Sequence, residues 1–183
     1  MKTLKSDRLI LRPVILSDAP IFIDWFKDRE VTKFLVRYQA GQKAPTLAEE
    51  RAWIRSVMKN KHEPVWCILN KDGVVIGNTT LRITPECKIA NFGIVIGDKT
   101  EWGKGYAVEV LQMLLTYAFV TLKMNRFELS VDVENTRALN AYKKVGFITE
   151  GCMRQQIYNK RTKKFGDVYV MSVLRDEWGK RDK

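Results

Sequence analysis

The chain has 183 residues, 45% of them hydrophobic, and carries a formal net charge of +11 at pH 7. This composition predicts one globular domain over residues 1–183 and excludes a disordered chain. No apolar run approaches the ~20 residues that a membrane helix needs, and residues 1–8 hold no signal-peptide core, so no membrane partner is expected. Cys67, Cys87 and Cys152 are odd in number and widely spaced, which predicts free thiols in a reducing cytoplasm and no metal site.

The positive charge has two interpretations. It is either a solvated surface that keeps the protein in solution, or the counterpart of an anionic partner such as a polyphosphate cofactor, a nucleotide-linked substrate or a ribosome. The basic residues are spread along the chain, with a denser run at 160–164 and a tail at 180–183. Aromatic residues do not alternate with that run, so nucleic-acid binding rests on charge alone and is not expected.

The first part of the chain predicts one strand and two helices. A strand is expected over 8–14, followed by a helix over 17–28 that Ser17 caps. A capping box of Thr46 and Glu49 opens a second helix that runs to about Lys59. The side chains expected to face inward from the first helix are Ile21, Trp25 and Phe26.

The rest of the chain predicts strands that surround two further helices. An amphipathic helix is expected over 108–122, and a shorter one over 136–145 that Gly146 ends. The expected strands lie at 65–69, 74–83, 89–96, 126–133, 148–157 and 168–174, with a tight hairpin turn at 71–73. The resulting order is β-α-α-β-β-β-α-β-α-β-β, an α/β fold in which helices cover both faces of a mixed sheet.

A glycine turn lies between a strand and the best helix of the chain. Residues 102–107 read Trp-Gly-Lys-Gly-Tyr-Ala. Glycines at a helix start leave backbone N–H groups bare, and the helix dipole adds positive charge, which favours phosphate. The spacing matches neither the dinucleotide fingerprint nor the P-loop. By itself the turn is equally consistent with a helix start that binds no ligand.

A second sequence motif, downstream of the glycine turn, favours a ligand-binding role for that turn. It spans 135–147, with asparagine at the strand end, alanine three residues on, tyrosine seven on, and then Gly146-Phe147. This block resembles the Gcn5-related N-acetyltransferase (GNAT) family, and residues 102–107 resemble that family's acetyl-CoA pyrophosphate loop. Segments 7–13 and 165–174 resemble the branch of ribosomal-protein N-terminal (RimJ/RimL-like) acetyltransferases.

The resemblance implies a single-domain GNAT fold with a splayed central strand pair and acetyl-CoA as the acyl donor. Backbone N–H groups of 103–107 would hold the pyrophosphate, and the pantetheine arm would lie in the strand gap beside Asn135. Tyr142 would lie beside the thioester sulfur. The implied cofactor-binding residues are Ile94, Val95, Ile96, Trp102, Gly103, Lys104, Gly105, Tyr106, Ala107, Asn135, Tyr142 and Lys144.

The reaction requires a neutral amine, a stabilised oxyanion and a protonated leaving thiolate. A backbone N–H within 94–96 is expected to stabilise the oxyanion, and the Tyr142 hydroxyl is expected to protonate the thiolate. Without the flanking motif at 135–147, the helical position of Tyr142 would indicate a core residue. Together with Asn135 and Glu128, it makes up the predicted catalytic set.

Two positions depart from the family pattern. Thr100 stands where the family's phosphate loop usually begins with glutamine or arginine, so one phosphate contact is expected to be either lost or replaced by Lys104 or Lys99. Asn91 stands where relatives often carry a glutamate, and asparagine cannot act as a base. The alternatives for the base are Glu128, Asp132, a water held by Asn91 and Ser130, or bulk solvent.

The predicted acceptor region is aromatic and basic, because Phe34, Tyr38, Arg37 and Lys43 all lie within 34–45. A polycationic acceptor such as a polyamine would require carboxylates in this region, so polyamines rank last among the candidate acceptors. The expected acceptor is a primary amine, with a protein N-terminal α-amine ahead of a nucleotide-linked amino sugar or another small amine. A non-catalytic acyl-CoA-binding module is the alternative, and the protein is expected to be a monomer or homodimer. The predicted substrate residues are Trp25, Arg37, Tyr38 and Asn91.

Overall fold

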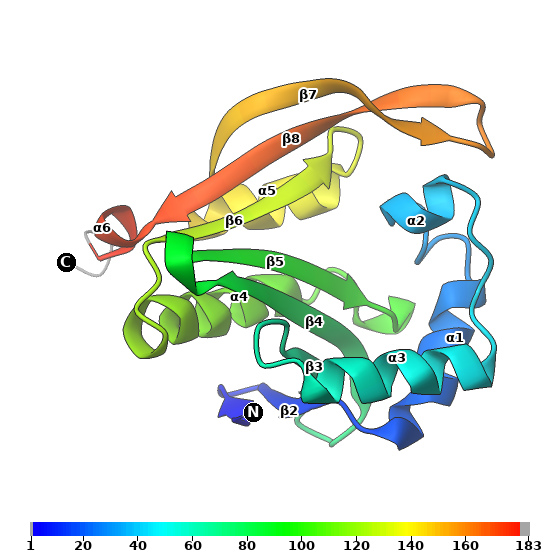
Figure 1. Cartoon of the computed structure of the whole chain (residues 1–183), viewed down its shortest axis with the longest axis horizontal. Coiled ribbons are helices and arrows are strands. Elements are labelled where there is room, and N and C mark those ends of the chain that lie inside the picture. The colour runs from blue at the N-terminus through cyan, green and yellow to red at the C-terminus, as the bar shows by residue number, and fades with distance from the viewer. Residues whose placement is uncertain (1, 180–183) are drawn as a thin grey trace.

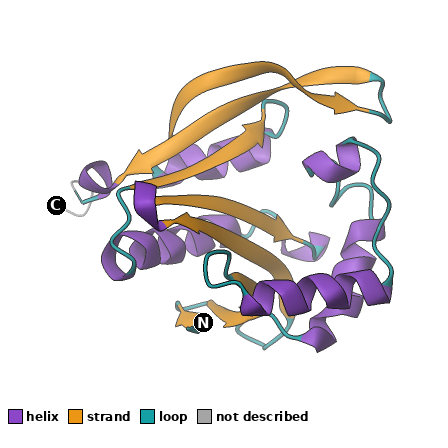
Figure 2. Ribbon diagram, in the orientation of Figure 1, coloured by secondary structure: helices purple, strands orange, loops and turns teal. Residues whose placement is uncertain are grey.

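The fold is built on one eight-stranded mixed sheet, which confirms the predicted fold class (Figures 1 and 2). The structure is a computed structural model that describes residues 2–179. In sheet order the strands are β1 (Leu4–Lys5), β2 (Leu9–Pro13), β3 (Val65–Asn70), β4 (Val75–Thr84), β5 (Ile89–Ile96), β6 (Arg126–Asp132), β8 (Lys164–Leu174) and β7 (Ile148–Asn159). The helices are α1 (Ala19–Lys27), α2 (Val36–Gln39), α3 (Leu47–Lys59), α4 (Tyr106–Thr116), α5 (Thr136–Val145) and α6 (Arg175–Trp178).

Helices cover both faces of the sheet, as predicted. Successive residues of β3 point to opposite faces. Val65 and Cys67 join the core beneath α1 and α3, whereas Trp66 and Ile68 join the larger core beneath α4 and α5. Among the described residues, no helix is long and apolar enough to cross a membrane.

The start of α1 differs from its prediction. A 3-10 turn over Leu16–Asp18 precedes the helix. Within this turn the Asp18 carboxylate, and not Ser17, accepts a hydrogen bond from the Ile15 backbone N–H at 2.8 Å. Ser17 is therefore not the cap. Ile21 is 37% exposed and does not face inward, because the buried face follows Ala19, Phe22, Ile23 and Phe26.

The later elements differ mainly in length. The helix predicted to reach residue 122 is α-helical only to Thr116 and continues as a π-helical turn over Tyr117–Thr121. The two late strands are longer than predicted and form the β7–β8 hairpin, with the basic run 160–164 at its turn. The elements β1, α2 and α6 were not predicted. The basic tail at 180–183 lies outside the described residues.

The predicted splayed pair is β5 and β6. These strands are parallel and pair at three positions: Ile89 with Arg126, Ala90 with Phe127 and Asn91 with Glu128. Beyond Asn91, β5 continues beside β4 alone, while β6 pairs with β8 along its whole length. Figure 1 shows the two strands separating toward their C-terminal ends, where the candidate functional site lies.

Candidate functional site

A cleft of about 730 Å³ opens where β5 and β6 separate. Its walls are the ends of both strands, the loop before α4, the start of α5, and the segment between α1 and α2. Most of the residues predicted for the site are brought together here. Those that line the cleft are Arg37, Ile94, Val95, Ile96, Trp102, Gly103, Gly105, Tyr106, Ala107, Asn135 and Tyr142.

The free edge of β5 presents backbone N–H groups to this cleft. Gly97 N–H donates to the Ile76 carbonyl at 2.9 Å, toward β4, and strand N–H groups alternate in direction. The N–H groups of Ile94 and Ile96 therefore face the gap, whereas that of Val95 faces β4. Of the three predicted oxyanion donors, Ile94 and Ile96 therefore have N–H groups directed into the cleft.

The glycine turn has the geometry of an anion site. Gly103 and Gly105 have φ of +81° and +82°, and neither position is crowded, so backbone conformation is what requires glycine. Gly105 is the N-cap of α4, and no side chain caps this helix. The first N–H groups of α4 are therefore open to a ligand. Trp102 closes the end of the gap by donating its indole N–H to the Ile96 carbonyl at 2.8 Å.

The lysines expected to replace the missing phosphate contact at Thr100 are already paired. Lys104 bonds Glu101 at 2.8 Å, and Lys99 bonds Asp28 at 2.8 Å and Glu30 at 2.7 Å. Lys144 is exposed and lies outside the cleft.

Sequence reasoning missed Arg137, which lies in the first turn of α5. Its guanidinium is 3.7 Å from the centroid of the Trp102 ring, and both residues line the cleft. Burial lowers the pKa of Arg137, and among residues 2–179 it forms no ion pair. The Glu30 charge acts on Arg137 from beyond salt-bridge distance, so Arg137 is a cation beside the glycine turn that has no salt bridge among the described residues. Its place two residues after Asn135, where a helix begins, was the signal available in the sequence.

Asn135 and Tyr142 lie on the opposite wall from β5. Asn135 caps α5, with its Oδ1 accepting from the Ala138 N–H at 3.2 Å, so its Nδ2 group is left to donate elsewhere. Tyr142 packs against Phe92 and Phe147, with ring centroids 6.4 Å and 5.7 Å away. This burial raises the pKa of Tyr142 to about 12, which keeps the hydroxyl protonated and able to donate at neutral pH.

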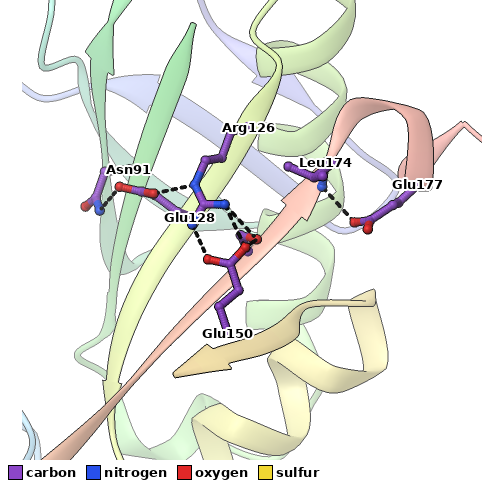
Figure 3. A network of polar contacts seen from close by, with 7 residues as sticks. Asn91, Arg126, Glu128, Glu150, Leu174 and Glu177 are labelled. Atoms are coloured by element: carbon purple, nitrogen blue, oxygen red, sulfur yellow. Dashed lines mark hydrogen bonds and ion pairs between the residues drawn. The ribbon is translucent and has the colours of Figure 1, made fainter. Parts of the chain in front are cut away.

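Glu128 and Asn91 lie at the closed end of the splay and do not line the cleft. Figure 3 shows the network of polar contacts that they join. Arg126 bonds Glu128 at 2.6 Å and also pairs with Glu150, and Asn91 donates to Glu128 at 3.4 Å. The Arg126 hydrogen bond lowers the pKa of Glu150 to about 2. This network fastens the strands where they are still paired. The structure therefore does not support the predicted roles of Glu128 as base and Asn91 as substrate contact.

Asp132 is the carboxylate that β6 places in the cleft. It is 8% exposed, and its two oxygens accept from the Gln39 side-chain amide at 2.8 Å and the Glu134 N–H at 2.9 Å. Both donors are neutral. Among residues 2–179 it has no cationic partner.

The predicted acceptor residues separate into three places. Arg37 lines the cleft, and its guanidinium lies 4.8 Å and 4.9 Å from the Phe26 and Tyr38 ring centroids. Tyr38 lines a smaller neighbouring cavity. Trp25 packs beneath the loop that follows β5, where a Cβ on Gly97 would lie 1.9 Å from its ring. Phe34, which the sequence placed in the acceptor region, also lines the cleft, as do Trp53 and Arg82, which the sequence did not indicate.

Comparison with known proteins agrees with this geometry. Residues 8–148 match the family model described as an acetyltransferase (GNAT) domain. The uncharacterized N-acetyltransferase p20 of Bacillus licheniformis is 31% identical over 97% of this chain and 99% of its own length. The L-amino acid N-acetyltransferase AaaT of Escherichia coli is 30% identical over 57% of this chain and 64% of its own length.

The fold also matches solved structures. The spermidine N-acetyltransferase of Vibrio cholerae, solved in complex with CoA and spermine, superposes with a TM-score of 0.84 at 22% identity, over 94% of this chain and 99% of its own. The open helix start, the free edge of β5 and the size of the cleft fit coenzyme A. The chain therefore belongs to the GNAT family and is an acetyl-CoA-dependent N-acetyltransferase of amines.

Proposed function

We propose that the acceptor is a primary amine that carries negative charge or a peptide backbone close to the amine, with the protein N-terminal α-amine as the first candidate and a nucleotide-linked amino sugar as the second. The observation that carries this proposal is Arg37. Its guanidinium lines the cleft, stacks on two rings and forms no ion pair among residues 2–179. The Arg37 charge also acts on the buried Glu50 carboxylate and on the Tyr38 hydroxyl, and a stacked guanidinium still offers N–H donors to a carboxylate or a carbonyl. The similarity to an L-amino acid N-acetyltransferase supports the same acceptor chemistry.

Spermidine is the competing acceptor, because a structural neighbour is a spermidine N-acetyltransferase. A polyamine would need free carboxylates in the cleft. Two of the carboxylates that line it, Glu30 and Glu101, are paired with Lys99 and Lys104, which leaves Asp132. The balance of unpaired charge in the cleft therefore favours an anionic or peptidic acceptor.

Different residues of the cleft have different roles in acetyl transfer. Bound acetyl-CoA supplies an acetyl group activated as a thioester. The open N–H groups of 103–107 and the Arg137 guanidinium would hold the phosphates of the coenzyme, and Asn135 Nδ2 would donate to its pantetheine arm. Asp132 accepts the proton of the attacking amine, and the Ile94 N–H stabilises the charge that develops on the carbonyl oxygen. Tyr142 donates its hydroxyl proton to the leaving sulfur.

The acceptor is identified by a side-by-side screen with acetyl-CoA, read as released thiol. We expect the highest kcat/KM for a peptide α-amine or an anionic amine, and the lowest for spermidine. Arg37→Glu is expected to raise the acceptor KM about 10- to 100-fold, because a hydrogen bond to a charged group contributes roughly 1.5–3 kcal/mol, and to leave the acetyl-CoA KM unchanged. Arg55→Glu on the exposed face of α3 is the control with the same charge change. Spermidine as the best substrate, improved by Arg37→Glu, would contradict the proposal.

The base is tested with Asp132→Asn. We expect kcat to fall about 100-fold near neutral pH, the lower end of the range for a positioned base, because solvent also accepts protons. The deficit should shrink as pH rises, since more of the acceptor amine is then neutral. Asp72→Asn in the exposed β3–β4 turn is the control. An equal deficit at every pH would assign Asp132 a structural role only.

The thiol chemistry supports a cytoplasmic place of action. Cys67 is buried, Cys87 and Cys152 are exposed, and all three are free. Exposed free thiols persist in a reducing compartment.

A further inference from the structure

A second cavity, of about 380 Å³, lies between the segment after α1 and the turn of the β7–β8 hairpin. We call it the basic cavity. Its lining includes no carboxylate, whereas five cations line it: Lys27, Arg29, Lys33, Lys43 and Arg161. Lys27 pairs with Asp24 at 3.0 Å, and the other four form no ion pair with any carboxylate of residues 2–179. Such a gathering of one sign of charge attracts a compensating anion.

The walls of this cavity are held together by specific contacts. The Lys160 N–H donates to the Gln39 carbonyl at 2.9 Å, which joins the hairpin turn to α2. Gly41 has φ of +90°, and a Cβ there would lie 2.8 Å from Lys160 Cδ, so glycine permits this close approach. Arg161, which is far from Lys43 in sequence, thereby lines the same cavity as Lys43. The cationic lining is a feature of the fold and not of one flexible segment.

The basic cavity adjoins the acceptor end of the cleft. Phe26 lines both cavities, and the Arg37 guanidinium that lines the cleft stacks on it. Gln39 lines the basic cavity, and its side-chain amide donates to Asp132, which lines the cleft. A ligand that contacts Gln39 in the basic cavity is therefore one hydrogen bond away from Asp132.

We propose that the basic cavity binds a phosphate-bearing ligand, and that its occupancy tunes acceptor turnover through the Gln39–Asp132 hydrogen bond. Phosphate matches the lining because Arg29, Lys43 and Arg161 offer charged N–H donors from three different segments of the chain. The volume suits a diphosphate or a nucleotide, since small-molecule sites begin near roughly 300 Å³. The binding itself is independent of the proposed acceptor. The effect on turnover rests on the proposed function of Asp132.

Binding is measured by calorimetry with inorganic pyrophosphate, on protein saturated with CoA so that the site before α4 is filled. We expect one equivalent to bind and Lys43→Glu/Arg161→Glu to weaken it at least about tenfold, because two charge-assisted contacts are lost. Arg55→Glu/Lys61→Glu, both exposed and outside the cavity, produce the same change in net charge and should leave the affinity within about twofold. Lys43→Gln/Arg161→Gln, with melting temperature as a folding check, replaces the reversal variant if that variant is unstable. Absence of binding, or equal weakening by both double variants, would overturn the site.

Kinetics distinguish the source of the phosphate. Pyrophosphate that competes with the acceptor would mean that the cavity holds a phosphate group of the acceptor itself. Pyrophosphate that changes kcat without competing would mean a separate effector. In either case Gln39→Leu, which removes the donor to Asp132, should preserve calorimetric binding and, for an effector, abolish the change in kcat. For an effector, a change in kcat that persists in Gln39→Leu would overturn the coupling, and this test does not depend on which amine is acetylated.

Discussion

Replacement of Tyr142 by phenylalanine is expected to lower kcat by about 10²–10⁴-fold, the usual range for a positioned general acid. The ring remains, so its packing on Phe92 and Phe147 is kept and the affinity for acetyl-CoA should change little. What is lost is the hydroxyl proton. Burial raises the pKa of that hydroxyl to about 12, so the acid is fully protonated at neutral pH and its contribution should persist to about pH 10.

The measurement compares steady-state kcat with the directly measured Kd for CoA. Tyr158→Phe is the matched control, because Tyr158 lies on the exposed β7–β8 hairpin and also packs against a phenylalanine, Phe165. Wild-type kcat in Tyr142→Phe would leave Tyr142 as a core residue and require another proton donor.

Gly105→Glu is expected to abolish the thermal stabilisation that acetyl-CoA gives the wild-type protein. A ligand at 100 times its Kd stabilises the folded state by about 2.7 kcal/mol, which a melting curve resolves easily. The substitution puts a negative charge at the open start of α4, where the predicted pyrophosphate lies. It also forces a side chain onto a residue with φ of +82°.

Gly73→Glu separates these two effects. Gly73 has φ of +78° and no neighbour within 4 Å of an added Cβ, so it suffers a similar backbone strain in the β3–β4 turn, away from the cleft. Both variants should melt below the wild type, but only Gly105→Glu should lose the response to acetyl-CoA. A retained response would place coenzyme A elsewhere.

Local patterns were sufficient for much of the fold. The capping box of Thr46 and Glu49 forms as predicted, with the Glu49 carboxylate 2.7 Å from the Thr46 N–H, because its partners are three residues apart. Gly146 ends α5 with φ of +104° for an equally local reason. The glycine turn and the Asn135 block are also short-range motifs, and they indicated the cofactor correctly.

The choice between Glu128 and Asp132 could not be made from the sequence. Both alternate onto the same face of β6, and what separates them is the position at which pairing with β5 ends. That position depends on contacts between distant segments, such as Arg126 with Glu150 and Gln39 with Asp132. The same applies to α2, a four-residue helix that docks on a hairpin more than a hundred residues later in the chain.

The short pairing between β5 and β6 also bears on how the molecule opens. Three paired positions make up the backbone pairing between the half-sheet of β1 to β5 and the half-sheet of β6, β8 and β7, and beyond them the two halves are joined by side-chain packing in a shared core. The amides of Ile94 and Ile96 should exchange with deuterium quickly in the free protein and slowly once the gap is filled. A donor molecule lying between the two parts acts as an interposed strand, so slower exchange should spread into both parts. Loading the donor then makes unfolding more cooperative before any amine arrives.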